Sequence, residues 1–149
     1  MKSNFLFWLL IIAVLTNTFP VAAQQSTKAP RVGFLIGPSL SSFGPRMEAF
    51  RQGLHELGYF EGKNIVIDSR FADEKLNRLP TLAAELVQSK VAIIVTGGAS
   101  PTRAAKEATS SIPIVMTNDP DPVASGVGIS LARPGGNITG AATMLEDLV

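Results

Sequence analysis

The sequence has no cysteine, a single histidine and a single tryptophan. Without cysteine the chain has no disulfides, no thiol catalysis and no lipid anchor attached through a cysteine. With His55 as its one histidine, it cannot build a zinc site from histidine and cysteine. His55 lies off the apolar stripe of the helix expected around it, which favours a solvated imidazole over a catalytic base with a partner in reach. This pattern does not support a Ser-His-Asp triad.

Clustered positive charge is also missing. The chain has 13 Lys and Arg against 12 Asp and Glu, spread along its length. A nucleic-acid-binding domain would need a basic patch or stripe, so no nucleic-acid partner is expected. The glycines after the first apolar run, Gly33 and Gly37, do not form G-x-G-x-x-G, and no P-loop motif occurs. We therefore expect no nucleotide and no other cofactor.

The first 23 residues have the layout of a secretory signal peptide. Lys2 supplies the positive charge, Phe5–Leu15 is an unbroken apolar run, and Val21-Ala22-Ala23 offers the small residues that a signal peptidase reads. The run is shorter than the ~20 residues of a membrane-spanning helix, although an uncleaved anchor is the alternative. We expect cleavage after Ala23, a periplasmic location, and a flexible lead-in at residues 24–30.

What the sequence does contain is a regular alternation of β-type apolar runs and amphipathic stripes. The expected strands are Val32–Ile36, Ile65–Arg70, Val91–Val95, Ile112–Met116 and Ile138–Thr143. The expected helices run from Pro45 to Gly58, along Leu79–Val87, from Ser100-Pro101 to about Ser110, and from Asp121-Pro122 to near Ala132. This order predicts an α/β fold with a doubly wound, parallel, five-stranded sheet, in the strand order 2-1-3-4-5.

Short loops of small or polar residues follow three of these strands and lead into helices. In an open α/β sheet such loops meet at the carboxyl ends of the strands, where backbone N–H groups and helix N-termini face a ligand. The candidate ligand-binding residues are Ser39, Ser41, Ser42, Gly97, Gly98, Ala99, Ser100, Thr117, Asn118 and Asp119. The pattern predicts a small-molecule site with no catalytic and no metal-binding residue.

Two of these loops have simpler interpretations beside the functional one. Gly97-Gly98 followed by Ser100 is consistent with a tight turn and an ordinary helix cap. Asp119 and Asp121 are able to bind a hard cation, but the prolines beside them favour a rigid turn with Asp121 as a cap. If the loops do bind a ligand, an amino acid suits them, with its carboxylate at the helix start near Ser100 and its ammonium at Asp119.

Several segments resemble one family in order along the chain. They are FRQGL at 50–54, LGYFEGKNI at 57–65, LPTLAAELV at 79–87, IPIVM at 112–116 and SLARPGGNITG at 130–140. These segments closely resemble the ABC-transporter substrate-binding proteins of the tryptophan/tyrosine-binding type. The resemblance covers residue 31 to about residue 145, which is nearly the whole mature chain.

The resemblance implies a periplasmic-binding-protein fold of the first type. In that family two α/β lobes close over a small molecule, the loaded protein docks on an ABC permease in the inner membrane, and some relatives bind aromatic amino acids. Members are roughly twice this length, so residues 31–149 are expected to be an amino-terminal lobe alone, from a truncated gene or an incomplete reading frame. The alternatives are a small flavodoxin-like enzyme domain and an inactive gene remnant.

Overall fold

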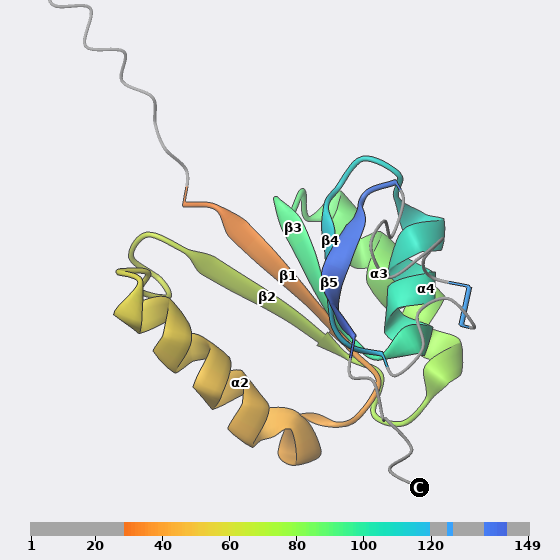
Figure 1. Cartoon of the computed structure of the whole chain (residues 1–149), viewed down its shortest axis with the longest axis horizontal. Coiled ribbons are helices and arrows are strands. Elements are labelled where there is room, and N and C mark those ends of the chain that lie inside the picture. Colours follow the sequence, from red (N-terminus) through yellow and green to blue (C-terminus); the bar gives the residue numbers. More distant parts are fainter. Residues whose placement is uncertain (1–28, 120–124, 127–135, 143–149) are drawn as a thin grey trace, which may run out of the picture.

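The computed structural model describes residues 29–119, 125–126 and 136–142, which form an α/β unit (Figure 1). The elements, in chain order, are β1 (Arg31–Ile36), α2 (Leu40–Glu56), β2 (Val66–Phe71), a 3₁₀ turn η1 (Leu76–Arg78), α3 (Leu79–Gln88), β3 (Ile93–Gly97), α4 (Ala99–Ala108), β4 (Ile114–Asp119) and β5 (Ile138–Ala142). The expected export segment lies outside the described residues, and so does the expected helix at 121–132 except for residues 125–126, which form a turn.

The strands form one five-stranded sheet in the order β2-β1-β3-β4-β5, and every pairing is parallel. The strand order and fold class predicted from the sequence are confirmed. β1 lies between β2 and β3, with Val32 opposite Ile67 on one side and Ile93 on the other. This register brings the carboxyl ends of β1 and β3 to the same edge, where Ile36 pairs with Gly97.

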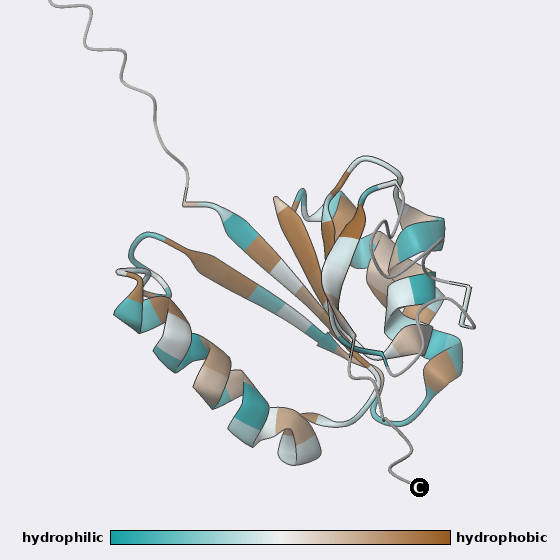
Figure 2. Ribbon diagram, viewed as in Figure 1, coloured by the Kyte–Doolittle hydropathy of each residue, from teal (hydrophilic) through white to brown (hydrophobic). Residues whose placement is uncertain are grey.

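Helices cover the two faces of the sheet unequally. In Figure 1, α2 lies on one face and α3 with α4 on the other. A right-handed crossover from β1 to β2 runs opposite to those from β2 to β3 and from β3 to β4, which places α2 alone on its face. Apolar side chains alternate accordingly: Phe34 and Val95 belong to the core beneath α2, and Leu35 and Ile94 to the core beneath α3 and α4. β3 is hydrophobic along most of its length in Figure 2.

The start of α2 differs from the expectation. The helix begins at Leu40, five residues before Pro45, and the Phe43 N–H already donates to the Ser39 carbonyl at 3.0 Å. Pro45 therefore lies in the second turn, where its missing N–H removes a single helical hydrogen bond. Ser39 is the N-cap residue, and Ser41 belongs to the first turn rather than to a loop.

The other end of α2 is as expected. Gly58 has φ +83° and follows the last helical residues, as a left-handed C′ glycine does. Its N–H donates to the His55 carbonyl at 2.9 Å, and the Tyr59 N–H donates to the Leu54 carbonyl at 2.8 Å. This pair of bonds is the Schellman motif, and it turns the chain back towards β2.

Two further boundaries correct the sequence prediction. β4 continues to Asp119, so Thr117–Asp119 forms the end of a strand rather than a loop. α4 begins at Ala99 with Gly98 as its N-cap, so the prediction that Ser100 caps this helix is wrong. Gly98 takes φ +96°, a conformation that glycine adopts readily, and it lets the chain enter the helix two residues before Ser100-Pro101 would start it.

Within the described part of the chain, no helix has the length and hydrophobicity to cross a membrane.

Candidate ligand-binding site

Three segments that are distant in the sequence meet at the carboxyl edge of the sheet. They are the turn from β1 into α2 at residues 37–39, the turn from β3 into α4 at Gly97-Gly98, and the end of β4. A Cβ atom built on Gly98 would lie 3.7 Å from the Asn118 carbonyl oxygen, so the second and third segments are in direct contact. The convergence expected from the parallel sheet is present.

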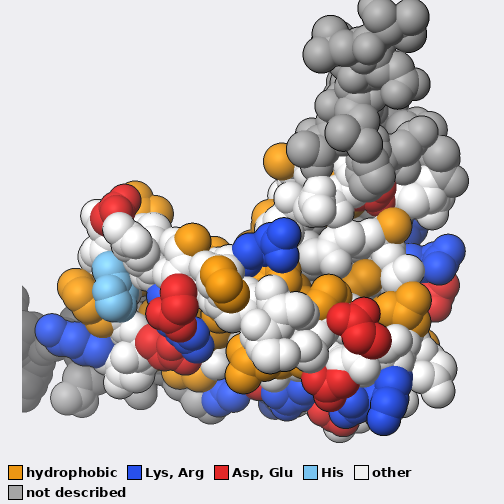
Figure 3. Space-filling view, turned by 90° about the horizontal axis from the view of Figure 1, so that it is seen from below, with side chains coloured by type: hydrophobic (Ala, Val, Ile, Leu, Met, Phe, Trp, Pro, Cys, Tyr) orange, Lys and Arg blue, Asp and Glu red, His pale blue; other side chains and the backbone are white. Residues whose placement is uncertain are grey.

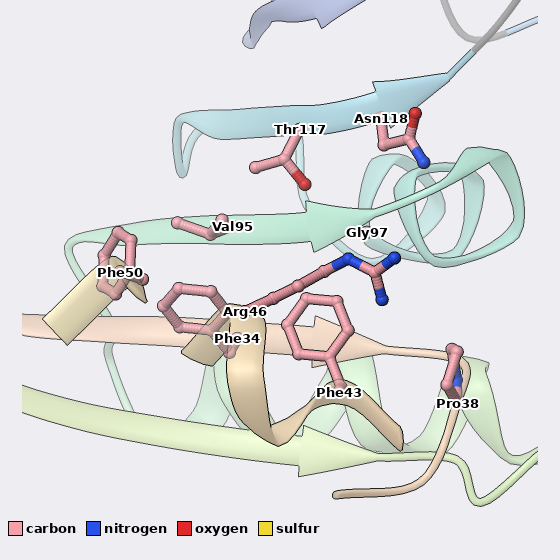
Figure 4. A pocket seen from close by; sticks show the side chains of 9 residues that line it. All are labelled: Phe34, Pro38, Phe43, Arg46, Phe50, Val95, Gly97, Thr117 and Asn118. Atoms are coloured by element: carbon pink, nitrogen blue, oxygen red, sulfur yellow. The ribbon is translucent and has the colours of Figure 1, made fainter. Parts of the chain in front are cut away.

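A cavity of about 470 Å³ opens beside these segments, on the face of the sheet that α2 covers. Its lining residues are Phe34, Pro38, Phe43, Arg46, Phe50, Val95, Gly97, Thr117 and Asn118 (Figure 4). α2 supplies one wall and the strands supply the floor, because α2 leaves part of that face uncovered. Ile93 and Val115, which pack against the same core, are only partly buried.

Of the predicted site residues, the cavity includes Gly97, Thr117 and Asn118. The remaining predicted residues, Ser39, Ser41, Ser42, Gly98, Ala99, Ser100 and Asp119, do not line it. The three serines instead interact with one another at the start of α2, where the Ser39 hydroxyl lies 2.9 Å from that of Ser41 and 3.2 Å from that of Ser42. Ser100 faces a smaller cavity of about 160 Å³ that is also lined by residues of η1, α3 and α4.

Asp119 is buried at the end of β4, with 1% of its surface exposed. The Ser125 hydroxyl donates to its carboxylate at 2.7 Å. A carboxylate taken out of water needs such hydrogen bonds, and this one is engaged within the lobe. The expected contact between Asp119 and a ligand's ammonium stays a prediction, while the geometry favours an internal role for this side chain.

Two buried threonines fix the turn between β3 and α4. The Thr102 hydroxyl donates to the Gly98 carbonyl at 2.7 Å, and the Thr96 hydroxyl lies 2.7 Å from that of Thr102. Since Thr102 has one hydroxyl proton, Thr96 is the donor in the second bond. The Thr117 hydroxyl in turn donates to the Thr96 carbonyl at 2.9 Å. This network ties β4, β3 and the start of α4 together, and it holds Gly98 in its left-handed conformation.

Sequence reasoning missed the walls of the cavity. Phe43, Arg46 and Phe50 occur at helical spacing on α2, which is the signal that could have identified a common face. The expected helix start at Pro45 leaves Phe43 outside the helix, so the sequence prediction does not place the three residues on one face. The surrounding surface has mixed charge, and Figure 3 shows acidic and basic side chains interspersed on one face. The described residues contain no group of three or more metal-ligating side chains.

Comparison with known proteins identifies the family. The family model described as ABC transporter substrate binding protein matches residues 34–147. The chain belongs to this family. The chain is also 36% identical, over 122 residues, to a tyrosine-binding protein from Clostridioides difficile strain R20291. That match covers 82% of the lobe and 35% of the relative.

Solved structures agree with this assignment. A substrate-binding protein with adhesive properties from Clostridium difficile, in its ligand-free, open form, is 26% identical, with a TM-score of 0.73 over 79% of the lobe and 40% of that chain. A conserved domain protein from Vibrio cholerae is 27% identical with the same TM-score, over 78% and 40%. A Streptococcus pneumoniae ABC domain in complex with L-Trp is 24% identical, over 78% and 39%, and with a TM-score of 0.71 it supports the fold.

The chain spans between a third and two fifths of the length of these relatives. The family consists of binding proteins rather than enzymes, and its members typically act outside the cytoplasm with the other components of an ABC transporter. The resemblance noted in the sequence and the fold that it implied are confirmed.

Proposed function

We propose that this lobe forms one wall of an exported solute-binding protein that delivers a small molecule to an ABC permease in the inner membrane. A second lobe would close over the ligand and supply the remaining contacts, as the greater length of the relatives indicates. The observation that carries the proposal is the convergence of Gly97-Gly98, Asn118 and the start of α2 beside an open cavity. We propose an amino acid as the ligand, in line with the tyrosine-binding relative.

The chemistry of the strand ends suits this role. Gly97 and Gly98 have no side chains, so a ligand can approach their backbone, and the N-terminus of α4 favours negative charge nearby. Asn118 brings an amide, with donors and an acceptor, to the cavity wall. Phe34, Phe43 and Val95 offer apolar surface below. Pockets for small molecules commonly combine such apolar walls with a few polar groups that fix orientation.

The test is a titration of the secreted chain, labelled with ¹⁵N, with each of the common L-amino acids and with acetate and inorganic phosphate. We expect an amino acid to shift the backbone amide signals of Gly97, Gly98 and Asn118 in a saturable manner. The affinity will be low because one lobe alone leaves the ligand open to solvent. Asn118→Ala should weaken binding about tenfold if the amide contacts the ligand.

Ser110→Ala is the matched control, since Ser110 is an exposed residue after α4 and outside the cavity. Its binding curve should match that of the unmodified chain. If none of the ligands moves the strand-end signals, or if the shifts gather elsewhere on the lobe, the proposed site is wrong.

A further inference from the structure

We propose that Arg46 binds the acidic group of the ligand in this cavity. The inference rests on the proposed function and defines the orientation of the ligand. The sequence alone suggested that the ligand's carboxylate lies at the start of α4. The structure instead offers a guanidinium for that carboxylate on α2, and an aromatic surface for the rest of the molecule.

Arg46 reaches across the cavity from α2. In Figure 4 its side chain runs past Phe43 and ends on the side where Gly97 and Asn118 lie. The guanidinium carbon is 5.8 Å from the centre of the Phe43 ring. Stacking on an aromatic face restricts the rotamers of the arginine side chain. The side chain therefore loses less conformational entropy when it binds an anion. Arg46 is therefore held at the opening of the cavity, where it is exposed to solvent and to an incoming ligand.

No carboxylate among the described residues forms a salt bridge with Arg46. Four other arginines of the described chain are paired, namely Arg31, Arg51, Arg70 and Arg78. Arg51 of the same helix is 2.9 Å from Glu61 and 2.7 Å from Glu48, and its hydrogen bonds, that to Glu61 first, raise the pKa of its guanidinium. A ligand's carboxylate would give Arg46 the kind of ion pair that Arg51 already forms with Glu48 and Glu61.

The opposite part of the cavity suits an apolar group. Phe34 and Phe50 pack edge to face, with ring centres 4.6 Å apart and planes at 72°. Phe34 and Val95 are 3% and 6% exposed, so this end of the cavity is formed by core residues. The volume of about 470 Å³ lies in the range of pockets that hold small organic molecules. The ligand that fits is a monocarboxylate with an aromatic or branched apolar body.

The experiment compares three probes on the secreted chain by NMR titration. L-phenylalanine has both charged groups, 3-phenylpropionate lacks the ammonium, and phenethylamine lacks the carboxylate. We expect the first two to bind and phenethylamine to bind at least about tenfold more weakly. Arg46→Gln should weaken the binding of both carboxylates by about tenfold and leave phenethylamine unchanged. Arg51→Gln removes the same charge from the same helix away from the cavity, and should leave all three affinities unchanged.

The possible outcomes separate this inference from the function on which it rests. If Arg46→Gln binds L-phenylalanine as the unmodified chain does, while the signals of Gly97 and Gly98 still shift, Arg46 has no role and the proposed site stands. Equal binding of phenethylamine and L-phenylalanine would also overturn the inference. If no probe shifts any signal of the unmodified chain, both proposals are wrong for this lobe. Because Arg46 is exposed, the variant is expected to fold, and its thermal midpoint should match that of the unmodified chain.

Discussion

At the scale of single residues, Gly140 has the tightest surroundings of the described glycines. It lies on β5 opposite Met116 with φ +151°, and an added Cβ would meet the Met116 carbonyl oxygen at 2.0 Å and its backbone nitrogen at 2.8 Å. Because those atoms are backbone, they cannot move without separating the two strands. We expect Gly140→Ala to lower the free energy of unfolding by about 2–4 kcal/mol, as measured by urea denaturation.

The control for this prediction is Gly53→Ala. Gly53 lies within α2 and an added Cβ would contact nothing within 4 Å. Alanine should raise stability there by about 0.5–1 kcal/mol, since glycine is a poor helix former. If both substitutions have effects of similar size and sign, β5 does not pair with β4 in the register described.

A second prediction at this scale concerns Asn64 in the turn between α2 and β2. Its side-chain amide donates to the Gly58 carbonyl at 2.9 Å and accepts from the Phe60 N–H at 2.6 Å. We expect Asn64→Ala to cost about 1–2 kcal/mol in thermal or urea unfolding, although the residue is exposed. Asn64→Asp keeps the acceptor and loses the donor, so its loss should be smaller. Equal losses for the two variants would mean that the bond accepted from the Phe60 N–H contributes nothing.

Individual residues of the candidate site could be predicted only where the sheet topology fixes their position. The cavity-lining positions of Gly97, Thr117 and Asn118 could be predicted because parallel strands end at one edge, whatever their side chains. Phe43 was missed because it lies before the expected helix start at Pro45, and Arg46 was missed because the path of an exposed side chain into a cavity depends on the packing of α2. The burial of Asp119 could not be read from the sequence either, since its partner Ser125 comes from a later segment.

At the scale of elements, α3 provides the clearest test of the core. Leu86 is fully buried beneath this helix, and a Cβ added to Gly33 on β1 would lie 3.2 Å from its side chain. Leu86→Ala should therefore destabilise the lobe by about 2–5 kcal/mol in urea denaturation. Leu57→Ala, at a residue with 75% of its surface exposed, should cost less than ~0.5 kcal/mol. A loss for Leu86→Ala as small as that for Leu57→Ala would show that α3 is not packed on the sheet.

Strand identity was easier to predict than helix boundaries. All five strands were recognised, and the clearest signal came from the apolar runs of β1, β3 and β4, which lie inside the sheet. Helix starts depend on competition between neighbouring residues. Pro45 and the pair Ser100-Pro101 each have the composition of a helix start, yet Ser39 and Gly98 begin their helices earlier. The residue at which each helix starts depends on contacts in the folded structure, and the local sequence does not reveal those contacts.

At the scale of the whole molecule, export is the property to test first. The run Phe5–Leu15 and the small residues at 21–23 predict cleavage after Ala23. N-terminal sequencing of the periplasmic fraction should therefore begin at Gln24. An Ala23→Asp variant should block processing and keep the longer form on the membrane. Recovery of the unmodified chain from the membrane fraction with Met1 in place would contradict the prediction.

The parallel arrangement of the sheet has a consequence for how fast the lobe folds. Among the described strands, no two neighbours are joined by a tight turn, and β1 needs partners far along the chain: Arg31 pairs with Val66, and Val32 with Ile93. Chains dominated by such distant contacts fold slowly, because the loops must close before any strand is paired. β1 is the first strand of the chain and cannot be completed until β3 has been made. A polypeptide that folds slowly in this way remains unfolded for longer, which suits passage through a translocation pore, as the proposed export of this protein requires.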